Sequence, residues 1–121
     1  IYAPAIIKDY KSVAAFGGQI DVYPTIMGLL GFNYTNNTAG IDLLNEKRPF
    51  MYFSADDKIG CINDSLFYIF RTNGIESLYK YKTLDTKNYL NDYIHIANEM
   101  KNYSFSNLQA SQWMISNKKT K

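Results

Sequence analysis

Short apolar segments alternate with polar turns between residues 50 and 81. Four of them are rich in aromatic and β-branched residues, which favour strands. They span residues 50–53, 59–62, 66–70 and 78–81. Asp, Asn and Gly residues separate them, and Asn73-Gly74 is the strongest hairpin signal in the chain. The pattern predicts a four-stranded antiparallel sheet in which consecutive strands are neighbours.

Apolar residues then recur at three- and four-residue steps between residues 87 and 117, which is the spacing of one helix face. The residues of this stripe are Leu90, Tyr93, Ile94, Ala97, Met100, Phe105, Leu108 and Trp113. We expect a long helix that covers one face of the sheet, and a break near residues 104–106 stays open as an alternative.

A shorter helix is predicted over residues 20–30. Asp21 stands where it can accept hydrogen bonds from the amides of the first turn. Pro24 falls in that turn, where its missing N–H costs nothing. Gly31 offers the left-handed conformation that ends many helices.

The segments around this helix complete the first part of the chain. Residues 1–3 are predicted to be the end of a strand, residues 5–19 a connection and residues 31–49 a surface loop. The fold class is therefore α+β. We expect one part at residues 1–49 and a second, sheet-plus-helix part at residues 50–121.

Composition narrows the class of protein. The 121 residues are 46% hydrophobic and 20% charged, so they can build a core. A formal net charge of +2 gives no indication of nucleic-acid binding. No apolar run reaches the length of a membrane span, and we expect the chain itself to be soluble. Its single cysteine excludes an internal disulfide and a multi-cysteine metal site.

The sequence of the first part carries more specific information than its helix pattern. Residues 17–31 read Gly-Gly-Gln-Ile-Asp-Val-Tyr-Pro-Thr-Ile-Met-Gly-Leu-Leu-Gly, and residues 1–4 read Ile-Tyr-Ala-Pro. Together they resemble a stretch of the sulfatase-like enzymes of the alkaline-phosphatase superfamily, and most of all the phosphoglycerol transferases related to lipoteichoic acid synthases. Weaker similarities follow at residues 40–44 and 78–79.

This resemblance implies the C-terminal portion of an alkaline-phosphatase-like α/β fold. The family's hydroxyl or modified-cysteine nucleophile and its acidic and Asp-His-Gly metal ligands precede the strand at residues 1–3. The resemblance thus implies a parent enzyme that uses a divalent metal, is anchored in a membrane and has an extracytoplasmic catalytic domain. The partner of this chain would be that upstream region, and no catalytic, cofactor or metal residue is expected here.

The titratable residues are better explained by structure than by catalysis. His95 falls within the predicted long helix and has no partner in the sequence that would define a site. Asp56, Asp57 and Asp64 follow no calcium-loop spacing and are typical of turns. Cys61 lies in an apolar strand, where a thiol without a nearby base is usually inert.

Tyrosines and Asp21 give the remaining candidates. The tyrosines could form a platform for a sugar or glycerol group, but a sheet–helix core with hydroxyls at its rim is the favoured interpretation. They are Tyr52, Tyr68, Tyr79, Tyr81, Tyr89 and Tyr93. Asp21 is expected to cap the helix and order the following loop, so that Asp21→Ala would cost about 1 kcal/mol. It is not expected to bind metal.

Two further functions remain as alternatives. A free-standing, non-catalytic binding or dimerisation module would use the aromatic sheet and the long helix, and a strand edge near Ile1 would promote self-association. A complete small enzyme is the weakest hypothesis, because no nucleophile–base pair can be assembled from the sequence. Whether the parent would cleave sulfate esters or phosphate esters is left open.

Overall fold

The computed structural model describes residues 5–6, 8–9 and 16–117. The chain divides into two compact units, Ile1–Arg48 and Pro49–Lys121. The strand expected at residues 1–3 lies outside the described residues, as does the middle of the expected connection, residues 10–15.

In the first unit, the helix predicted over residues 20–30 is present. A 3₁₀ turn, η1 (Gln19–Asp21), leads directly into α1 (Val22–Leu29), and Pro24 lies in the first turn of α1 as predicted. Gly31 has a φ of +68°. Its N–H donates to the Gly28 carbonyl and the Phe32 N–H donates to the Met27 carbonyl, both at 3.1 Å. These two bonds form a Schellman motif, which confirms Gly31 as the stop of the helix.

The capping role predicted for Asp21 is wrong for α1, although its carboxylate accepts the Gly18 N–H at the start of η1, the 3₁₀ turn that leads into α1. Asp21 immediately precedes α1, but its side chain makes no capping hydrogen bond to that helix. A capping residue has an extended backbone that turns its side chain over the first amides. Asp21 is instead the last residue of η1, with φ −86° and ψ −10°, and its carboxylate is bound elsewhere.

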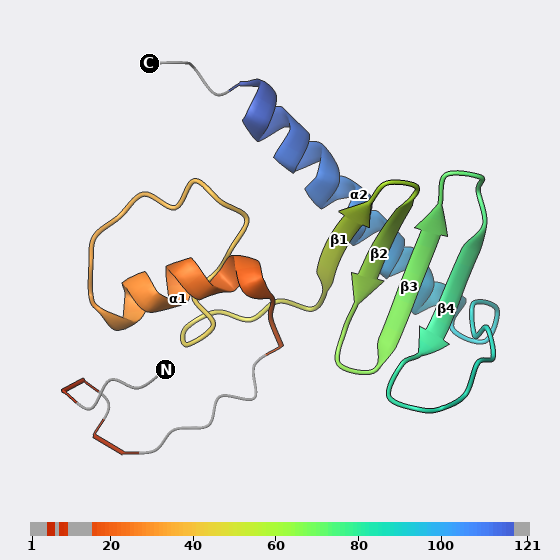
Figure 1. Cartoon of the computed structure of the whole chain (residues 1–121), viewed down its shortest axis with the longest axis horizontal. Coiled ribbons are helices and arrows are strands. Elements are labelled where there is room, and N and C mark those ends of the chain that lie inside the picture. The colour runs from red at the N-terminus through yellow and green to blue at the C-terminus, as the bar shows by residue number, and fades with distance from the viewer. Residues whose placement is uncertain (1–4, 7, 10–15, 118–121) are drawn as a thin grey trace. The chain divides into compact units, whose positions relative to one another are not determined.

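The second unit contains the predicted sheet (Figure 1). Its strands are β1 (Met51–Ala55), β2 (Lys58–Ile62), β3 (Leu66–Arg71) and β4 (Glu76–Lys80). All neighbours are antiparallel, in the order β1-β2-β3-β4. The four-stranded meander is therefore confirmed.

The hairpin expected at Asn73-Gly74 connects β3 to β4. The Arg71 N–H donates to the Ile75 carbonyl at 2.9 Å, and the Gly74 N–H donates back to the Arg71 carbonyl at 2.8 Å. Gly74 has a φ of +83°, and the Asn73 side chain accepts the Ile75 N–H at 3.1 Å. The loop thus has three residues and ends in a left-handed glycine, which is a common alternative to the two-residue turn.

The long helix, α2 (Ile94–Ser116), is continuous through residues 104–106 and starts seven residues later than predicted. Asn88 explains the late start. Its side chain accepts the Leu78 N–H at 2.9 Å and the Leu90 N–H at 3.0 Å, and the Tyr89 N–H donates to the Leu78 carbonyl. Asn side chains that bind nearby backbone in this way compete with helix formation.

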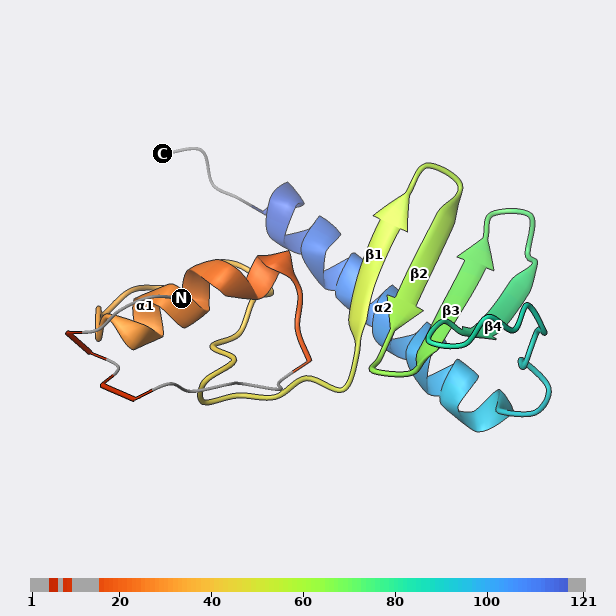
Figure 2. The ribbon, with the colours of Figure 1, turned by 60° about the horizontal axis from the view of Figure 1, so that its bottom comes forward.

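One face of the sheet packs against α2, which contacts β1, β2 and β3 (Figures 1 and 2). Cys61, Tyr68 and Leu78 lie side by side in register on this face, and Ala97 and Met100 of α2 cover them. The predicted stripe is only partly correct, because Trp113 is 67% exposed, Tyr93 and Ile94 are also exposed, and Leu90 precedes the helix. The last turns of α2 run past the β1 edge of the sheet, so no strand lies beneath them.

The opposite face of the sheet is not covered by α2; it is largely apolar, with Lys58, Arg71 and Ser77 toward one end. Met51, Ile62, Phe67 and Tyr79 form one cross-strand row on it and are only half-buried. Phe53, on the same face, is 41% exposed. No described element of residues 49–117 covers this surface, which we call the open face.

Candidate functional site

Asp21 is the centre of a buried polar cluster in the first unit. It is fully buried, and its Oδ2 accepts the Gly18 N–H at 2.9 Å. Its Oδ1 accepts the Ile41 N–H at 2.9 Å and is ion-paired with Nη2 of Arg48. Arg48 Nη2 also donates to the Ala39 carbonyl at 3.0 Å. The carboxylate thus joins the start of α1 to residues 39–48, the loop that it was expected to order.

The glycines near Asp21 allow close backbone approach. A Cβ on Gly40 would lie 2.2 Å from the Ile20 carbonyl oxygen and 3.0 Å from Cγ of Pro24. A Cβ on Gly28 would lie 2.1 Å from the carboxylate of Asp42. Residues from the segments 17–31 and 40–44 therefore pack against each other. Their described contacts are structural, and the Asp21 carboxylate is already occupied by three donors.

The acidic residues and the histidine are dispersed. His95 is exposed on α2, and Asp56 and Asp57 lie in the β1–β2 turn. In the β2–β3 turn, Asn63 rather than Asp64 makes the turn bonds, since its Oδ1 accepts the Ser65 and Leu66 N–H groups. Within residues 5–6, 8–9 and 16–117, no three His, Cys, Asp or Glu side chains are grouped so that they could hold a metal ion.

Cys61 is fully buried in β2 between Tyr52 and Tyr68 of the neighbouring strands. Burial raises the pKa of its thiol, and a hydrogen bond with Ser104 opposes this effect only in part. A catalytic thiol requires the reverse shift.

The six tyrosines do not form a single platform. Tyr52 is hydrogen-bonded to Ser111 at 2.6 Å, which joins β1 to α2. Tyr68 donates to Glu76 at 2.6 Å, which joins β3 to β4. Burial, together with the Glu76 carboxylate, raises the pKa of Tyr68. Tyr79 lies on the open face, and Tyr81 donates to the Asn63 carbonyl at 2.9 Å. The core interpretation therefore describes Tyr52 and Tyr68 best.

Tyr89 and Tyr93 gather instead around Lys80, at the end of β4. The Lys80 ammonium lies 4.4 Å from the centroid of the Tyr89 ring and 5.1 Å from that of the Tyr93 ring. Lys87 Nζ is 4.8 Å from the Tyr89 centroid, and the Tyr89 hydroxyl donates to Asp85. These cation–π contacts hold the connection between β4 and α2 in place.

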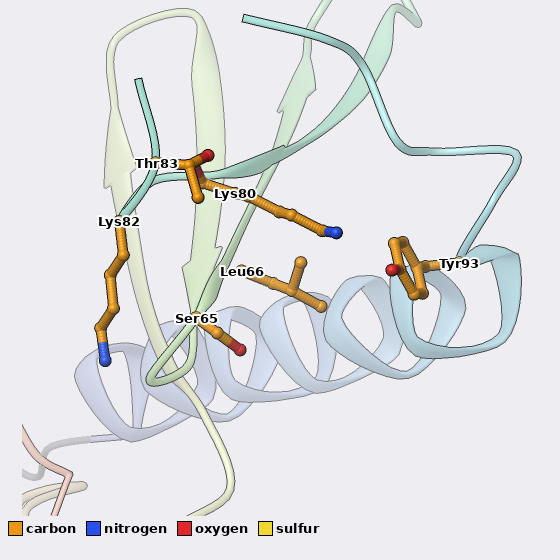
Figure 3. A pocket seen from close by; sticks show the side chains of 6 residues that line it. All are labelled: Ser65, Leu66, Lys80, Lys82, Thr83 and Tyr93. Atoms are coloured by element: carbon orange, nitrogen blue, oxygen red, sulfur yellow. The ribbon is translucent and has the colours of Figure 1, made fainter. Parts of the chain in front are cut away.

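Beside this cluster is a pocket of about 220 Å³ (Figure 3). Its lining residues are Ser65, Leu66, Lys80, Lys82, Thr83 and Tyr93. Of these six residues, only Tyr93 is among the candidates that the sequence predicts. The pocket was missed because it forms where the β2–β3 turn, the end of β4 and the start of α2 meet, and no local motif marks that meeting point.

Comparison of the chain with protein-family models, with curated proteins and with solved structures gives no match in any of the three. In the part of the chain that the structure describes, no helix has the length and apolar character required to span a membrane.

Proposed function

We propose that this chain is the C-terminal structural part of a metal-dependent, sulfatase-like enzyme, either a hydrolase or a phosphoglycerol transferase. The family resemblance is the basis of this proposal, and its residues are concentrated in segments 17–31 and 40–44. In the structure these segments pack together around Asp21 and Gly40. Their role here is to form a stable unit beside an active site that the preceding region would supply.

In such an enzyme a divalent metal would activate a hydroxyl nucleophile and stabilise charge on the transferred sulfate or phosphate group. The described residues of this chain would supply no ligand to that metal. Asp21 is fully buried and engaged by three donors, and Cys61 is buried with a raised pKa. The contribution of the chain is therefore to complete the fold.

The main observation in support of a structural role is the size of the open face. Four strands about 4.8 Å apart, with five residues of about 3.4 Å each, give it a footprint of roughly 300 Å². A stable complex between separate proteins buries about 800 Å² on each partner. The open face alone is too small for that, but it suits a region of the same polypeptide, whose packing does not carry the full entropy cost of association.

One observation favours the alternative, a free-standing binding or dimerisation module. Trp113 and Ile115, near the C-terminal end of α2, are 67% and 75% exposed and add apolar surface in the second unit. Such residues are common at protein–protein contacts. A dimer of this chain would have to use them in addition to the open face.

Activity assays of two proteins test the proposal: this 121-residue chain, and the complete product of the gene that encodes it. Both are assayed with bis(p-nitrophenyl) phosphate and p-nitrophenyl sulfate, with Mn²⁺ and with a chelator. We expect metal-dependent activity only in the complete product, with an Asp-His-Gly motif upstream of Ile1. Metal-dependent activity in the isolated chain would overturn the proposal, as would a complete product with no such upstream region.

Light scattering on the isolated chain distinguishes the structural role from the free-standing module. A monomer fits the structural role. A dimer that becomes monomeric with Trp113→Lys, but not with the exposed control Gln112→Lys, would favour the module and contradict the structural role.

A further inference from the structure

The pocket at the end of β4 joins an apolar surface to a positive charge. Leu66 lies at its centre, between Lys80 and Tyr93 on one side and Lys82 on the other (Figure 3). The lysine stems and the tyrosine ring add further carbon surface. The pocket is partly open to solvent, and its volume of about 220 Å³ leaves room for a small organic molecule.

Lys80 is held in place for binding. Its ammonium is placed against the rings of Tyr89 and Tyr93, and the hydroxyl of Tyr93 is the main cause that raises the pKa of Lys80. The ion pairs of the described residues involve Arg48, Lys58, Lys87 and Lys101. Within the described part of the chain no carboxylate lies at ion-pair distance from Lys80 or Lys82, although the Asp85 carboxylate is near enough to add to the raised pKa of Lys80.

The donors at the pocket favour one kind of anion. The Lys80 ammonium and the Tyr93 hydroxyl point toward each other, next to Leu66, whereas the Lys82 ammonium points away from both (Figure 3). The Tyr93 oxygen accepts from the Lys80 ammonium, which leaves the Tyr93 O–H and the remaining ammonium N–H groups to donate to the two oxygens of one carboxylate. A phosphate dianion carries a second charge, and Lys82 does not bring a second cation toward it in this arrangement.

We propose that this pocket binds a small aliphatic monocarboxylate. The carboxylate lies beside these two groups and accepts from Lys80 Nζ and from the Tyr93 hydroxyl, and the alkyl chain covers Leu66 and the stem of Lys82. The charge pair orients the ligand and burial of the chain adds affinity, which is the usual division of roles in small-molecule sites. The site belongs to the second unit and does not depend on the function proposed above.

Titrations of the full chain with hexanoate, followed by amide NMR shifts at constant ionic strength and pH 7, test the site. We expect saturable shifts at Ser65, Leu66, Thr83 and Tyr93, with an affinity on the order of millimolar, because the ligand has only eight heavy atoms. Each methylene removed from the ligand should weaken binding about fourfold. Acetate and 1-hexanol, which each lack one half of the recognised chemistry, should give no saturable shifts below tenfold higher concentrations.

Three variants locate the binding. Lys80→Met keeps the stem and should weaken hexanoate binding at least tenfold. Tyr93→Phe keeps the ring and should weaken it severalfold, so it serves if Lys80→Met is unfolded by circular dichroism. Asp64→Asn removes a negative charge next to Ser65 and should tighten binding. Unchanged affinity in folded Lys80→Met or in Tyr93→Phe overturns the proposal. So does equal binding of 1-hexanol, or inorganic phosphate that binds more tightly than hexanoate.

Discussion

Asp21 and Arg48, which are 27 residues apart in the sequence, form a buried ion pair in the first unit. The pair fastens the start of α1 to the end of the loop that follows it. The same carboxylate also accepts two backbone amides, so three donors depend on one side chain. Asp21 therefore joins segments that are distant in the sequence. Its replacement should cost more stability than the loss of a helix cap.

We predict that Arg48→Met destabilises the first unit by roughly 3–5 kcal/mol, because it leaves the Asp21 charge buried without its partner. Asp21→Ala should also exceed the cost of about 1 kcal/mol that is typical of a lost cap. Hydrogen exchange of the Ile41 amide, which binds Asp21 directly, measures the effect. Lys47→Met, at the exposed neighbouring position, is the matched control and should leave that exchange rate unchanged. A cost near 1 kcal/mol for both variants would contradict the ion-pair role.

Gly40→Ala gives a second prediction for the first unit. The new methyl group would lie 2.2 Å from the Ile20 carbonyl oxygen, and this backbone leads directly into η1 and α1, so it cannot move aside easily. We expect a loss of about 3 kcal/mol, comparable with the upper range for overpacked cores. Gly31→Ala, where nothing lies near the added Cβ but φ is +68°, should cost about 1 kcal/mol. Urea unfolding followed at amides of residues 20–43 ranks the two, and an equal cost would rule out the clash.

The sheet was predictable because its signals are local. Strand period, aromatic content and turn residues such as Asn73-Gly74 depend on neighbours in the sequence, and all four strands formed in the predicted order. The helix stop at Gly31 was equally local. The start of α2 was not, because Asn88 binds the backbone of Leu78, ten residues away on β4.

The candidate sites were harder to predict for the same reason. The sequence places Asp21 next to a helix, but it does not show that Arg48 and the Ile41 amide reach the carboxylate from a loop 20 or more residues later. Nor does it show that Tyr93 faces Lys80, since this depends on how the connection after β4 folds back. Residue type was informative about turns and core, and long-range pairing determined the rest.

Glu76 should make the stability of the second unit depend on pH. Burial works to raise the pKa of its carboxyl, but hydrogen bonds from Lys101 and Tyr68 outweigh this, so the pKa lies below its ordinary value of 4.5. The folded state then binds fewer protons than the unfolded state at moderately acidic pH. The stabilisation is present above pH 4.5 and is lost as the pH falls through the lowered pKa.

Glu76→Gln should therefore lower the urea midpoint at pH 7 and should lose less stability than the natural chain between pH 5 and pH 3. Urea unfolding at several pH values, followed by circular dichroism, measures both curves. Glu99→Gln, at an exposed position of α2, is the control and should follow the natural chain throughout. Parallel curves for Glu76→Gln and the natural chain would show that the native carboxyl is not stabilised in its charged form.

Cys61 tests whether the second unit is well packed. Its thiol is fully buried, and burial raises its pKa above the ordinary value of 9.0, so less than half of it is thiolate at pH 9. Reaction with a disulfide reagent then requires opening of the sheet–helix core. If opening costs about 4 kcal/mol, the native rate falls about a thousandfold below that of the chain in urea. A variant with Cys61→Ala and Ser106→Cys places the thiol at an exposed position of α2 and should react at full rate without urea. Rapid reaction of Cys61 at pH 7 in the folded chain would contradict the inert role and make this thiol a candidate nucleophile.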